Sequence, residues 1–214
     1  MSLIVNEIFL SIQGESLYAG LPCVFVRLTG CNLRCRFCDT VYAYHEGAET
    51  PIAEIIKQVD SYGFKLVEIT GGEPLLQKNT SVLAKLLLEA GYEVLIETNG
   101  SKDISLIDSR CKRIMDVKCP GSNEAESLYS PNIKHLSAND QVKFVIGDRK
   151  DFDYAIGISK ALSPDFPKTR LLFSPAYETL KPHILAEWIL ESKLPVRLHM
   201  QLHKLIWPGI DRGV

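Results

Sequence analysis

The chain has 214 residues, which is long enough for one substantial hydrophobic core and short for two full domains. Its formal net charge of −2 gives no reason to expect a nucleic-acid or anionic-membrane partner. No run of about 20 apolar residues is present to span a bilayer, and residues 1–7 lack the basic start and apolar run of a secretory signal. These features predict a single cytoplasmic domain over residues 1–214.

The first half of the chain alternates apolar strands with amphipathic helices. A strand over residues 23–29 runs directly into a cysteine-rich loop. Thr50 and Pro51 then predict the N-cap and first residue of a helix whose apolar stripe continues to Val59. The remaining elements expected in this half are strands over 66–70 and 93–97 and, between them, a helix over about 81–89.

The second half continues the alternation, although two of its connections carry little helix signal. The connection over residues 101–112 is short, and the connection over residues 119–140 contains Pro120, Gly121 and Pro131. Repeated strand–helix units predict a parallel sheet. We therefore expect an α/β fold: a partial (β/α) barrel of about six parallel strands, with some crossover helices shortened or missing. Its later elements are expected as strands over 113–118, 141–146, 170–174 and 196–202 and helices over about 151–162 and 180–192.

Polar residues follow the predicted strands at the points where they end. In parallel α/β folds the carboxyl ends of the strands meet at one edge, and the functional site lies there. These segments locate a site without identifying its reaction. They are Thr29–Cys31, Thr70–Pro74, Glu97–Gly100, Lys118–Pro120 and Ser174–Pro175.

The spacing of Cys31, Cys35 and Cys38 points to a metal centre. Three thiolates this close together can hold a [4Fe–4S] cluster and leave its fourth iron free for a small chelating molecule. A structural zinc site is the alternative, with His45 as a fourth ligand. The polar loop with two arginines disfavours a buried, inert cysteine trio.

A second motif strengthens the iron–sulfur interpretation. Phe37 precedes the third cysteine, and Gly71-Gly72-Glu73-Pro74 ends the next strand, one βα unit after the cysteine loop. With these motifs the chain resembles the radical S-adenosylmethionine (SAM) superfamily. The resemblance implies that a [4Fe–4S] cluster and SAM generate a 5′-deoxyadenosyl radical that abstracts hydrogen from a substrate, so that the cofactor carries the chemistry and the protein positions it.

Further segments resemble the 7-carboxy-7-deazaguanine synthase family within that superfamily. This resemblance implies a lyase that converts 6-carboxy-5,6,7,8-tetrahydropterin to 7-carboxy-7-deazaguanine, with ring contraction and loss of ammonia, for queuosine-type nucleosides. It also implies catalytic SAM, Mg²⁺, an electron donor such as flavodoxin or ferredoxin, and a homodimer. The matching segments are Ser11–Ser16, Gly20–Pro22, Phe25–Arg27, Cys38–Thr40, Asp116–Ser122 and His199–Lys204.

The family pattern assigns substrate roles to several residues. Glu15 is expected to accept N–H bonds from the amidine edge of the pterin, and the planar fork of Arg27 to bind the substrate carboxylate. From sequence alone, Arg27 is equally a surface arginine on an edge strand, and Thr40, the implied Mg²⁺ ligand, is a turn or cap residue. The full set implied for the substrate is Gln13, Gly14, Glu15, Arg27, Thr70, Gln201, His203 and Pro208.

The same pattern assigns a second set of residues to SAM. No side chain is expected to act as a direct acid or base, because the radical derives from SAM. The implied SAM contacts are Phe37, Cys38, Asp39, Gly72, Glu73, Lys118, Ser122, Lys143 and Ser174.

The chain departs from the family pattern at two positions. Ser16 stands where the family has a glycine, and Pro208, terminal in some members, is followed here by six residues. Two other functions fit parts of the sequence: a radical SAM activase that installs a glycyl radical on a partner protein, and a zinc-stabilised binding module without catalysis. The segment from Gln13 to Glu15, with Arg27 and Thr40, favours a small pterin over both.

Overall fold

One nine-stranded sheet organises the chain in this computed structural model, which describes all 214 residues. The strands follow the order β3-β1-β2-β4-β5-β6-β7-β8-β9, and every pairing from β2 to β9 is parallel. The strands are β1 (Ser2–Ile12), β2 (Pro22–Leu28), β3 (Ala48–Pro51), β4 (Leu66–Gly71), β5 (Glu93–Thr98), β6 (Lys112–Asp116), β7 (Gln141–Ile146), β8 (Leu171–Pro175) and β9 (Arg197–Leu198).

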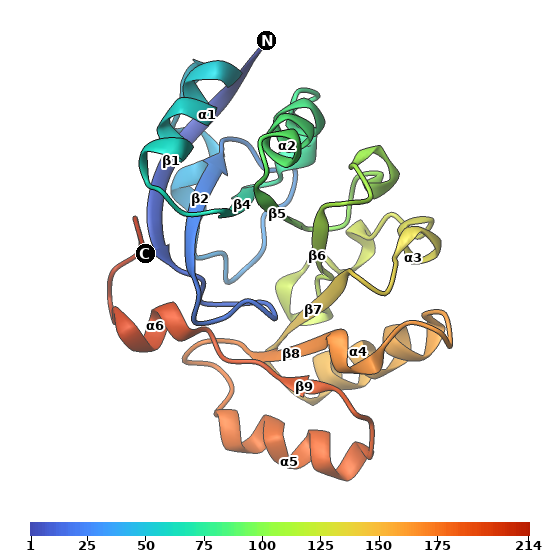
Figure 1. The fold of residues 1–214 in the computed structure, drawn as a ribbon. Coiled ribbons are helices and arrows are strands. Elements are labelled where there is room, and N and C mark those ends of the chain that lie inside the picture. Colours follow the sequence, from blue (N-terminus) through green and yellow to red (C-terminus); the bar gives the residue numbers. More distant parts are fainter.

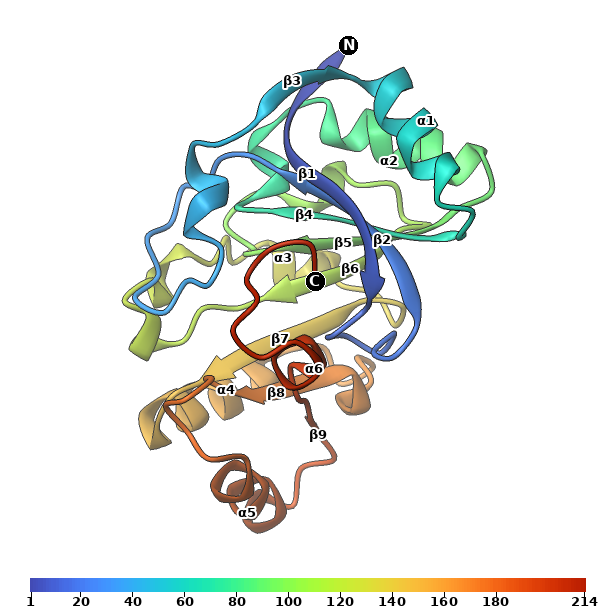
Figure 2. The ribbon, with the colours of Figure 1, turned by 90° about the vertical axis from the view of Figure 1, so that its left-hand side faces the viewer.

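Helices line the outer side of this curved sheet, and the C-terminal segment lies on its inner side. Figure 1 shows the strands as an arc with α1 to α5 along its outside, and Figure 2 shows the C-terminal segment crossing in front of the strands. The predicted partial barrel is therefore confirmed. The helices are α1 (Ile52–Ser61), α2 (Thr80–Glu89), α3 (Asn132–His135), α4 (Arg149–Ala161), α5 (Pro182–Ser192) and α6 (Leu202–Ile206).

Both connections with little helix signal lack a full crossover helix. Between β5 and β6 the chain forms one 3-10 turn, Ile104–Leu106. Between β6 and β7 it forms two such turns and the four-residue α3. The prediction of shortened crossovers is thus confirmed.

Two predicted boundaries are wrong. Pro51, not Thr50, caps α1, because Ala48–Pro51 pairs with the start of β1 and holds Thr50 in an extended conformation. The strand expected over 196–202 is reduced to Arg197–Leu198. The chain leaves β8 after His199, and the Leu202 backbone N–H donates instead to Gly14 O at 2.9 Å and starts α6.

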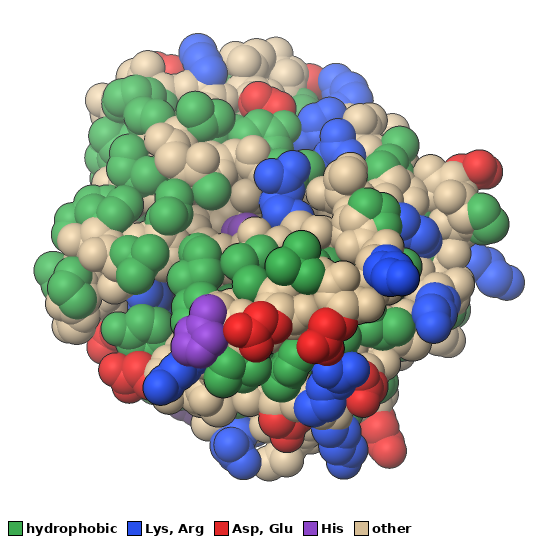
Figure 3. Space-filling model, turned by 90° about the horizontal axis from the view of Figure 1, so that it is seen from below, with side chains coloured by type: hydrophobic (Ala, Val, Ile, Leu, Met, Phe, Trp, Pro, Cys, Tyr) green, Lys and Arg blue, Asp and Glu red, His purple; other side chains and the backbone are tan.

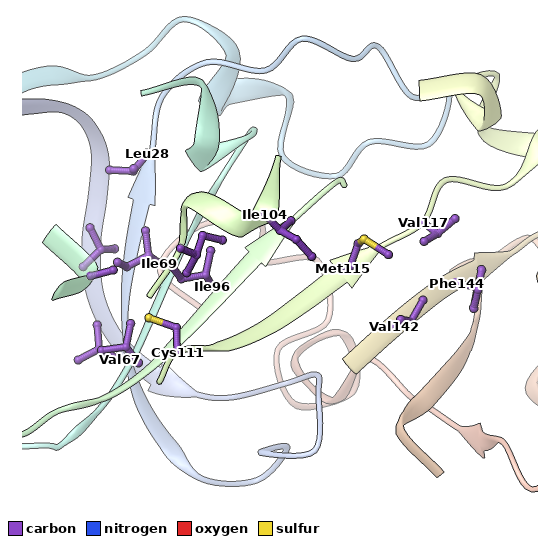
Figure 4. Packing of buried hydrophobic residues seen from close by; sticks show 14 of the residues in the cluster. Leu28, Val67, Ile69, Ile96, Ile104, Cys111, Met115, Val117, Val142 and Phe144 are labelled. Atoms are coloured by element: carbon purple, nitrogen blue, oxygen red, sulfur yellow. The ribbon is translucent and has the colours of Figure 1, made fainter. Parts of the chain in front are cut away.

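Alternate residues along the parallel strands build two different interiors. Val67 and Ile69 of β4 point outward into the large apolar cluster under the helices. Figure 4 shows Ile96, Met115 and Phe144 of the next strands in that same cluster. A second, smaller cluster occupies the inner face and consists of Cys23, Phe25, Leu66, Leu95 and Ile114, with Phe9 and Tyr18 packed against it.

Some apolar side chains remain exposed in the C-terminal third, including Leu190 of α5 and Leu205 and Ile206 of α6. Figure 3 views the molecule from the side of α5, where hydrophobic side chains are mixed with charged ones. No helix of the structure has the length and apolar composition needed to cross a membrane.

Candidate active site at the carboxyl ends of the strands

A cavity of about 400 Å³ lies over the inner face of the sheet. The smaller apolar cluster lies on the same face beneath the cavity and contributes Phe25 to its lining. Three acidic side chains that line the cavity come two positions after residues of this cluster on the same strands: Glu68 after Leu66, Glu97 after Leu95, and Asp116 after Ile114. The three motif cysteines line the cavity as well, so one space joins the predicted metal centre to the inner charged groups.

The loop after β2 carries Cys31, Cys35 and Cys38, all half-buried. Its backbone is anchored by the segment after β6: the Arg34 N–H donates to Glu124 Oε1 at 2.6 Å, and the Arg36 N–H to Ser122 O at 3.0 Å. The loop thus depends on contacts with residues about 90 positions away, which fix its shape without a helix or strand.

The thiols lie beside a cation and beside hydrogen-bond donors. Burial raises the pKa of Cys31 and that of Cys35, the latter to about 11, while the nearby Lys118 ammonium group acts in the opposite sense. The Leu33 N–H and Asn99 Nδ2 lie 3.4 and 3.9 Å from Cys31 Sγ as donors. Donors to the sulfurs are one means by which proteins tune iron–sulfur clusters. The three cysteines therefore fit a [4Fe–4S] cluster.

The zinc alternative lacks a fourth ligand here. His45 does not line the cavity, and no three His, Cys, Asp or Glu side chains lie close enough to hold one metal ion. A [4Fe–4S] cluster with one iron left to a small molecule needs only the three thiolates.

Gly72 occupies a position where a side chain does not fit. A Cβ atom there would lie 2.4 Å from Gly30 O and 2.7 Å from the Cys31 Cβ. The end of β4 can therefore pack against the cysteine loop only through glycine. Glu73, assigned to SAM by the family pattern, is fully buried, does not line the cavity, and accepts from the N–H groups of Leu75 and Asn99 and from the Thr98 hydroxyl.

Lys143 is the centre of a buried ionic cluster. Its ammonium group contacts Glu15 at 2.5 Å, Glu97, and Asp116 at 3.2 Å, and Asp116 also pairs with Lys118 at 3.0 Å. All of these side chains line the cavity. The three protons of the Lys143 ammonium group thus face carboxylates of the chain itself.

These contacts set the charge of each carboxyl group. Burial favours the neutral form of Glu15 and is the largest single influence, but Lys143, the two histidines His199 and His203, and the Gln201 hydrogen bond together outweigh it and hold the pKa of Glu15 far below its ordinary value. Lys118 and Lys143 likewise outweigh burial at Asp116 and lower its pKa. At Glu97 burial prevails over Lys143, and the pKa is raised. Glu15 and Asp116 are therefore charged at neutral pH.

The C-terminal segment forms the remaining wall. The Gln201 amide donates to Glu15 Oε1 at 2.7 Å, and Lys204 pairs with Asp39 at 3.3 Å. His203 packs so closely on Gly14 that a Cβ there would lie 2.3 Å from the imidazole Nδ1. Burial lowers the pKa of His203, which makes the ring neutral at pH 7. Gly14 thus lets the loop after β1 and the start of α6 meet.

Arg27 and Thr40 lie at the rim of the same cavity. The Arg27 Nε donates to Glu7 Oε1 at 2.8 Å, and its two terminal nitrogens make no hydrogen bond within the chain. Thr40 directly precedes the 3-10 turn Val41–Tyr44, and its hydroxyl donates to Asp39 Oδ1 at 2.9 Å. The guanidinium lies over the Phe9 and Tyr42 rings, so its two terminal nitrogens, together with the Thr40 oxygen, are what is available to a ligand.

The structure thus brings most of the predicted residues into one cavity, and leaves four outside it. Ser122 is buried with its hydroxyl bonded to Cys119 O, Ser174 is buried on the inner face of β8, and Pro208 is exposed; Glu73 is the fourth. The predicted residues that line the cavity are Gln13, Gly14, Glu15, Arg27, Cys31, Cys35, Phe37, Cys38, Asp39, Thr40, Thr70, Gly72, Lys118, Lys143, Gln201 and His203.

Three carboxyl groups of the cavity were given no role of their own by the sequence, although Glu97 and Asp116 stand in segments singled out there: Glu68, Glu97 and Asp116. Each is an acidic residue within or at the end of an otherwise apolar parallel strand, where both faces are normally buried. A charged residue in such a strand is the signal that could have identified them.

Comparison with known proteins identifies the family. A profile of the Radical SAM superfamily matches residues 25–163. The 7-carboxy-7-deazaguanine synthase of Koribacter versatilis is 41% identical over 98% of this chain and 99% of its own length, and that of Chlorobaculum tepidum is 41% identical over 98% and 96%. The chain belongs to the 7-carboxy-7-deazaguanine synthase family of radical SAM enzymes.

This membership confirms the family predicted from the cysteine and glycine motifs, and the superfamily implies a [4Fe–4S] cluster and SAM. The fold agrees as well. The crystal structure of QueE from Escherichia coli superimposes with a TM-score of 0.80 over 95% of both chains at 21% identity. The 7-carboxy-7-deazaguanine synthase fold is therefore retained although four-fifths of the aligned residues differ.

Proposed function

We propose that this protein converts 6-carboxy-5,6,7,8-tetrahydropterin to 7-carboxy-7-deazaguanine, with loss of ammonia, in queuosine-type biosynthesis. The observation that carries this proposal is the single cavity shared by the three cysteines and by Glu15, Arg27 and Thr70. The activity is that named for relatives that are about 41% identical over nearly their whole length.

Cys31, Cys35 and Cys38 would hold the cluster, and the end of β4 at Gly72 would lie against SAM. The bound cluster and SAM supply the radical that abstracts hydrogen. Phe37 and Asp39 stand beside the cysteines in the cavity wall, and Lys118 adds positive charge next to Cys35. These residues position SAM, while the smaller apolar cluster beneath the cavity excludes water from that side.

The remaining cavity residues would bind the pterin. Glu15, charged and held by Lys143 and Gln201, offers a fixed acceptor for N–H groups. The two free nitrogens of Arg27 suit the substrate carboxylate, since a guanidinium fork binds a carboxylate through two parallel hydrogen bonds. Thr40 beside Asp39 would supply oxygen to Mg²⁺, which takes few protein ligands besides water and substrate oxygens.

Two further parts of the proposal concern partners. An electron donor such as flavodoxin or ferredoxin would reduce the cluster. A homodimer would cover part of the apolar surface that includes Leu190, Leu205 and Ile206. Neither nucleic acid nor a membrane enters the proposed reaction.

Anaerobic turnover tests the proposal. Reconstituted protein with SAM, a reductant and the carboxypterin should yield the deazaguanine by mass spectrometry, faster with Mg²⁺ than without, and should bind about four irons per chain. Cys35→Ala should lose both iron and product, because a cluster ligand is gone. Cys111→Ala, at a cysteine outside the cavity, should retain both. Iron loading with radical transfer to a protein glycine and no pterin product would point to an activase instead.

A further inference from the structure

The orientation of the Gln13 side-chain amide in the cavity is fixed by its hydrogen-bond partners. The Glu15 backbone N–H donates to Gln13 Oε1 at 2.9 Å, and a backbone N–H can only donate. The atom of Gln13 that faces Glu68 is therefore the NH₂ group, which donates to Glu68 Oε2. Gln13 is 2% exposed, so this arrangement is enclosed by the protein.

Glu68 differs from the other four acids of the cavity, one of which is Asp39 paired with Lys204, in having no cation partner. Glu15, Glu97 and Asp116 all contact Lys143, whereas no Lys, Arg or His side chain pairs with Glu68. The side chain is 2% exposed and still lines the cavity, and its Oε1 makes no hydrogen bond within the chain. A buried, unpaired carboxylate would be strongly unfavourable, whereas a neutral carboxylic acid is tolerated at such a position.

The groups around Glu68 also favour the neutral acid. Burial raises its pKa well above the ordinary value, and the negative charges of Glu97 and Glu15 raise it further. Lys143 acts in the opposite sense, and the Gln13 amide does so through its hydrogen bond. From β2, the thiol of Cys23 is the remaining titratable neighbour, and burial raises its pKa as well. The net direction is upward, so Glu68 carries a proton at neutral pH.

Since Oε2 accepts from Gln13, the proton resides on Oε1, the oxygen without a partner in the chain. We propose that Glu68 determines substrate specificity as a neutral carboxylic acid whose Oε1 hydroxyl donates a hydrogen bond to the ring carbonyl oxygen of the heterocycle. This inference rests on the proposed function, because it assigns a contact for that pterin. Glu15 then accepts hydrogen bonds from the N–H groups of the ring, and Glu68 donates one to its carbonyl oxygen.

This pairing makes a prediction about ligand class. A heterocycle with adjacent N–H and carbonyl groups can donate to Glu15 and accept from Glu68. A ring that carries an amino group in place of the carbonyl would bring a second hydrogen-bond donor to the Glu68 hydroxyl, which needs an acceptor. A site that hydrogen-bonds a ligand group rejects analogues that lack it, since its own buried polar group is then left unpaired.

The test compares Glu68→Gln, which keeps a donor and does not titrate, with Glu68→Leu, which removes the donor. A matched control is Glu187→Gln, at an exposed glutamate of α5. The SAM-loaded holoenzyme of each variant is titrated with carboxypterin by calorimetry from neutral to alkaline pH. Infrared spectra of the same proteins without substrate report a protonated carboxyl group. Circular dichroism and iron content verify that each variant folds and holds its cluster.

We expect Glu68→Leu to bind carboxypterin about tenfold more weakly or worse, and Glu68→Gln to stay within about threefold of wild type. Wild-type affinity should fall at alkaline pH as Glu68 loses its proton, and Glu68→Gln should lack this loss. The carboxylic acid band should be present in wild type and Glu187→Gln and missing in both Glu68 variants.

Equal binding by wild type and both Glu68 variants would overturn the role of Glu68 alone, as would a Gln variant as weak as the Leu variant or an unchanged carboxyl band. Failure of wild type to bind carboxypterin at all would overturn the proposed function and this contact together. The two failures are therefore distinguishable.

Discussion

The outer and inner faces of the parallel sheet consist of alternate residues of the same strands, yet they are stabilised in different ways. On β7, Phe144 points outward and packs edge-to-face on Phe173 at a centroid distance of 5.4 Å, while its neighbour Lys143 points inward to three carboxylates. The outer face is stabilised by removal of apolar surface from water. The inner face depends on charges that balance one another, so a single change there affects all its members.

The largest effect is expected for Lys143→Met. The variant leaves Glu15, Glu97 and Asp116 without their shared cation, and removal of one partner from a buried ion pair lowers the free energy of unfolding by about 3–5 kcal/mol. Displacement of Glu15 should also lower kcat/KM by about 10²-fold. Denaturant unfolding measures the change in the free energy of unfolding, and steady-state kinetics measures the change in kcat/KM. Lys150→Met, at an exposed lysine of α4, is the control and should change the free energy of unfolding by less than about 0.5 kcal/mol.

The free energies of unfolding of wild type and Lys143→Met should depend on pH in different ways, as the pKa shifts of the carboxyl groups predict. In wild type the pKa values of Glu15 and Asp116 are lowered, so these groups stabilise the fold above their unfolded pKa values and lose that contribution as the pH falls. In Lys143→Met burial is opposed only by the remaining partners, such as Lys118 at Asp116 and Gln201 at Glu15, so both pKa values rise and acidification relieves the variant. The stability difference between the proteins should shrink from pH 7 towards about pH 5. A difference that grows over this interval would contradict the ionic cluster.

A smaller effect is expected on the outer face of β7. Ile146→Val removes one buried methyl group from the large apolar cluster and should lower the free energy of unfolding by about 0.5–1.5 kcal/mol. KM for the carboxypterin should not change, because Ile146 points away from the cavity. Thermal unfolding and kinetics together provide the check. A large change in KM with little change in stability would mean that the two faces are not independent.

The smallest effect is expected at the rim, where the C-terminal segment crosses the cavity. Arg212 stacks on the Tyr42 ring at 4.1 Å and pairs with Glu46 at 2.8 Å, but both partners of the ion pair are more than half exposed. Arg212→Ala should therefore lower the free energy of unfolding by less than about 1 kcal/mol. The difference should diminish at high salt, which screens exposed charges. A salt-independent loss of several kcal/mol would place this contact among the core interactions.

Local patterns in the sequence were sufficient for the parallel strands from β2 to β8 and for the cysteine motif, whereas β1 and β3 were not predicted. The strand predicted over 141–146 matches β7 at both ends, because its residues and their alternation are local properties. Cys31 and Gly72 were recognisable for the same reason: each belongs to a short motif with fixed spacing. The N-cap of α1 was misplaced, since Thr50 is claimed by pairing with β1, which lies almost 50 residues earlier.

The ionic cluster could not be predicted, because its members meet only through strand order and register. Lys143 was assigned to SAM from its place near a strand end, and in the structure its partners come from the loop after β1 and from β5 and β6. Glu68 lacked any local signal of its partner, since Gln13 is 55 residues away. Gln201 and His203 of the C-terminal wall were assigned to the substrate, but the conformation of that wall was missed in a similar way: α6 begins where Leu202 leaves the sheet for Gly14.

The wall contributed by Gln201 and Leu202 is synthesised long after the rest of the site. The cysteine loop emerges from the ribosome early, and about 160 residues must follow before this wall can close against Gly14 and Glu15. At typical translation rates that interval lasts roughly 8–30 s. During this time the side of the cavity at Gly14 and Glu15 lacks the cover that it has in the finished protein.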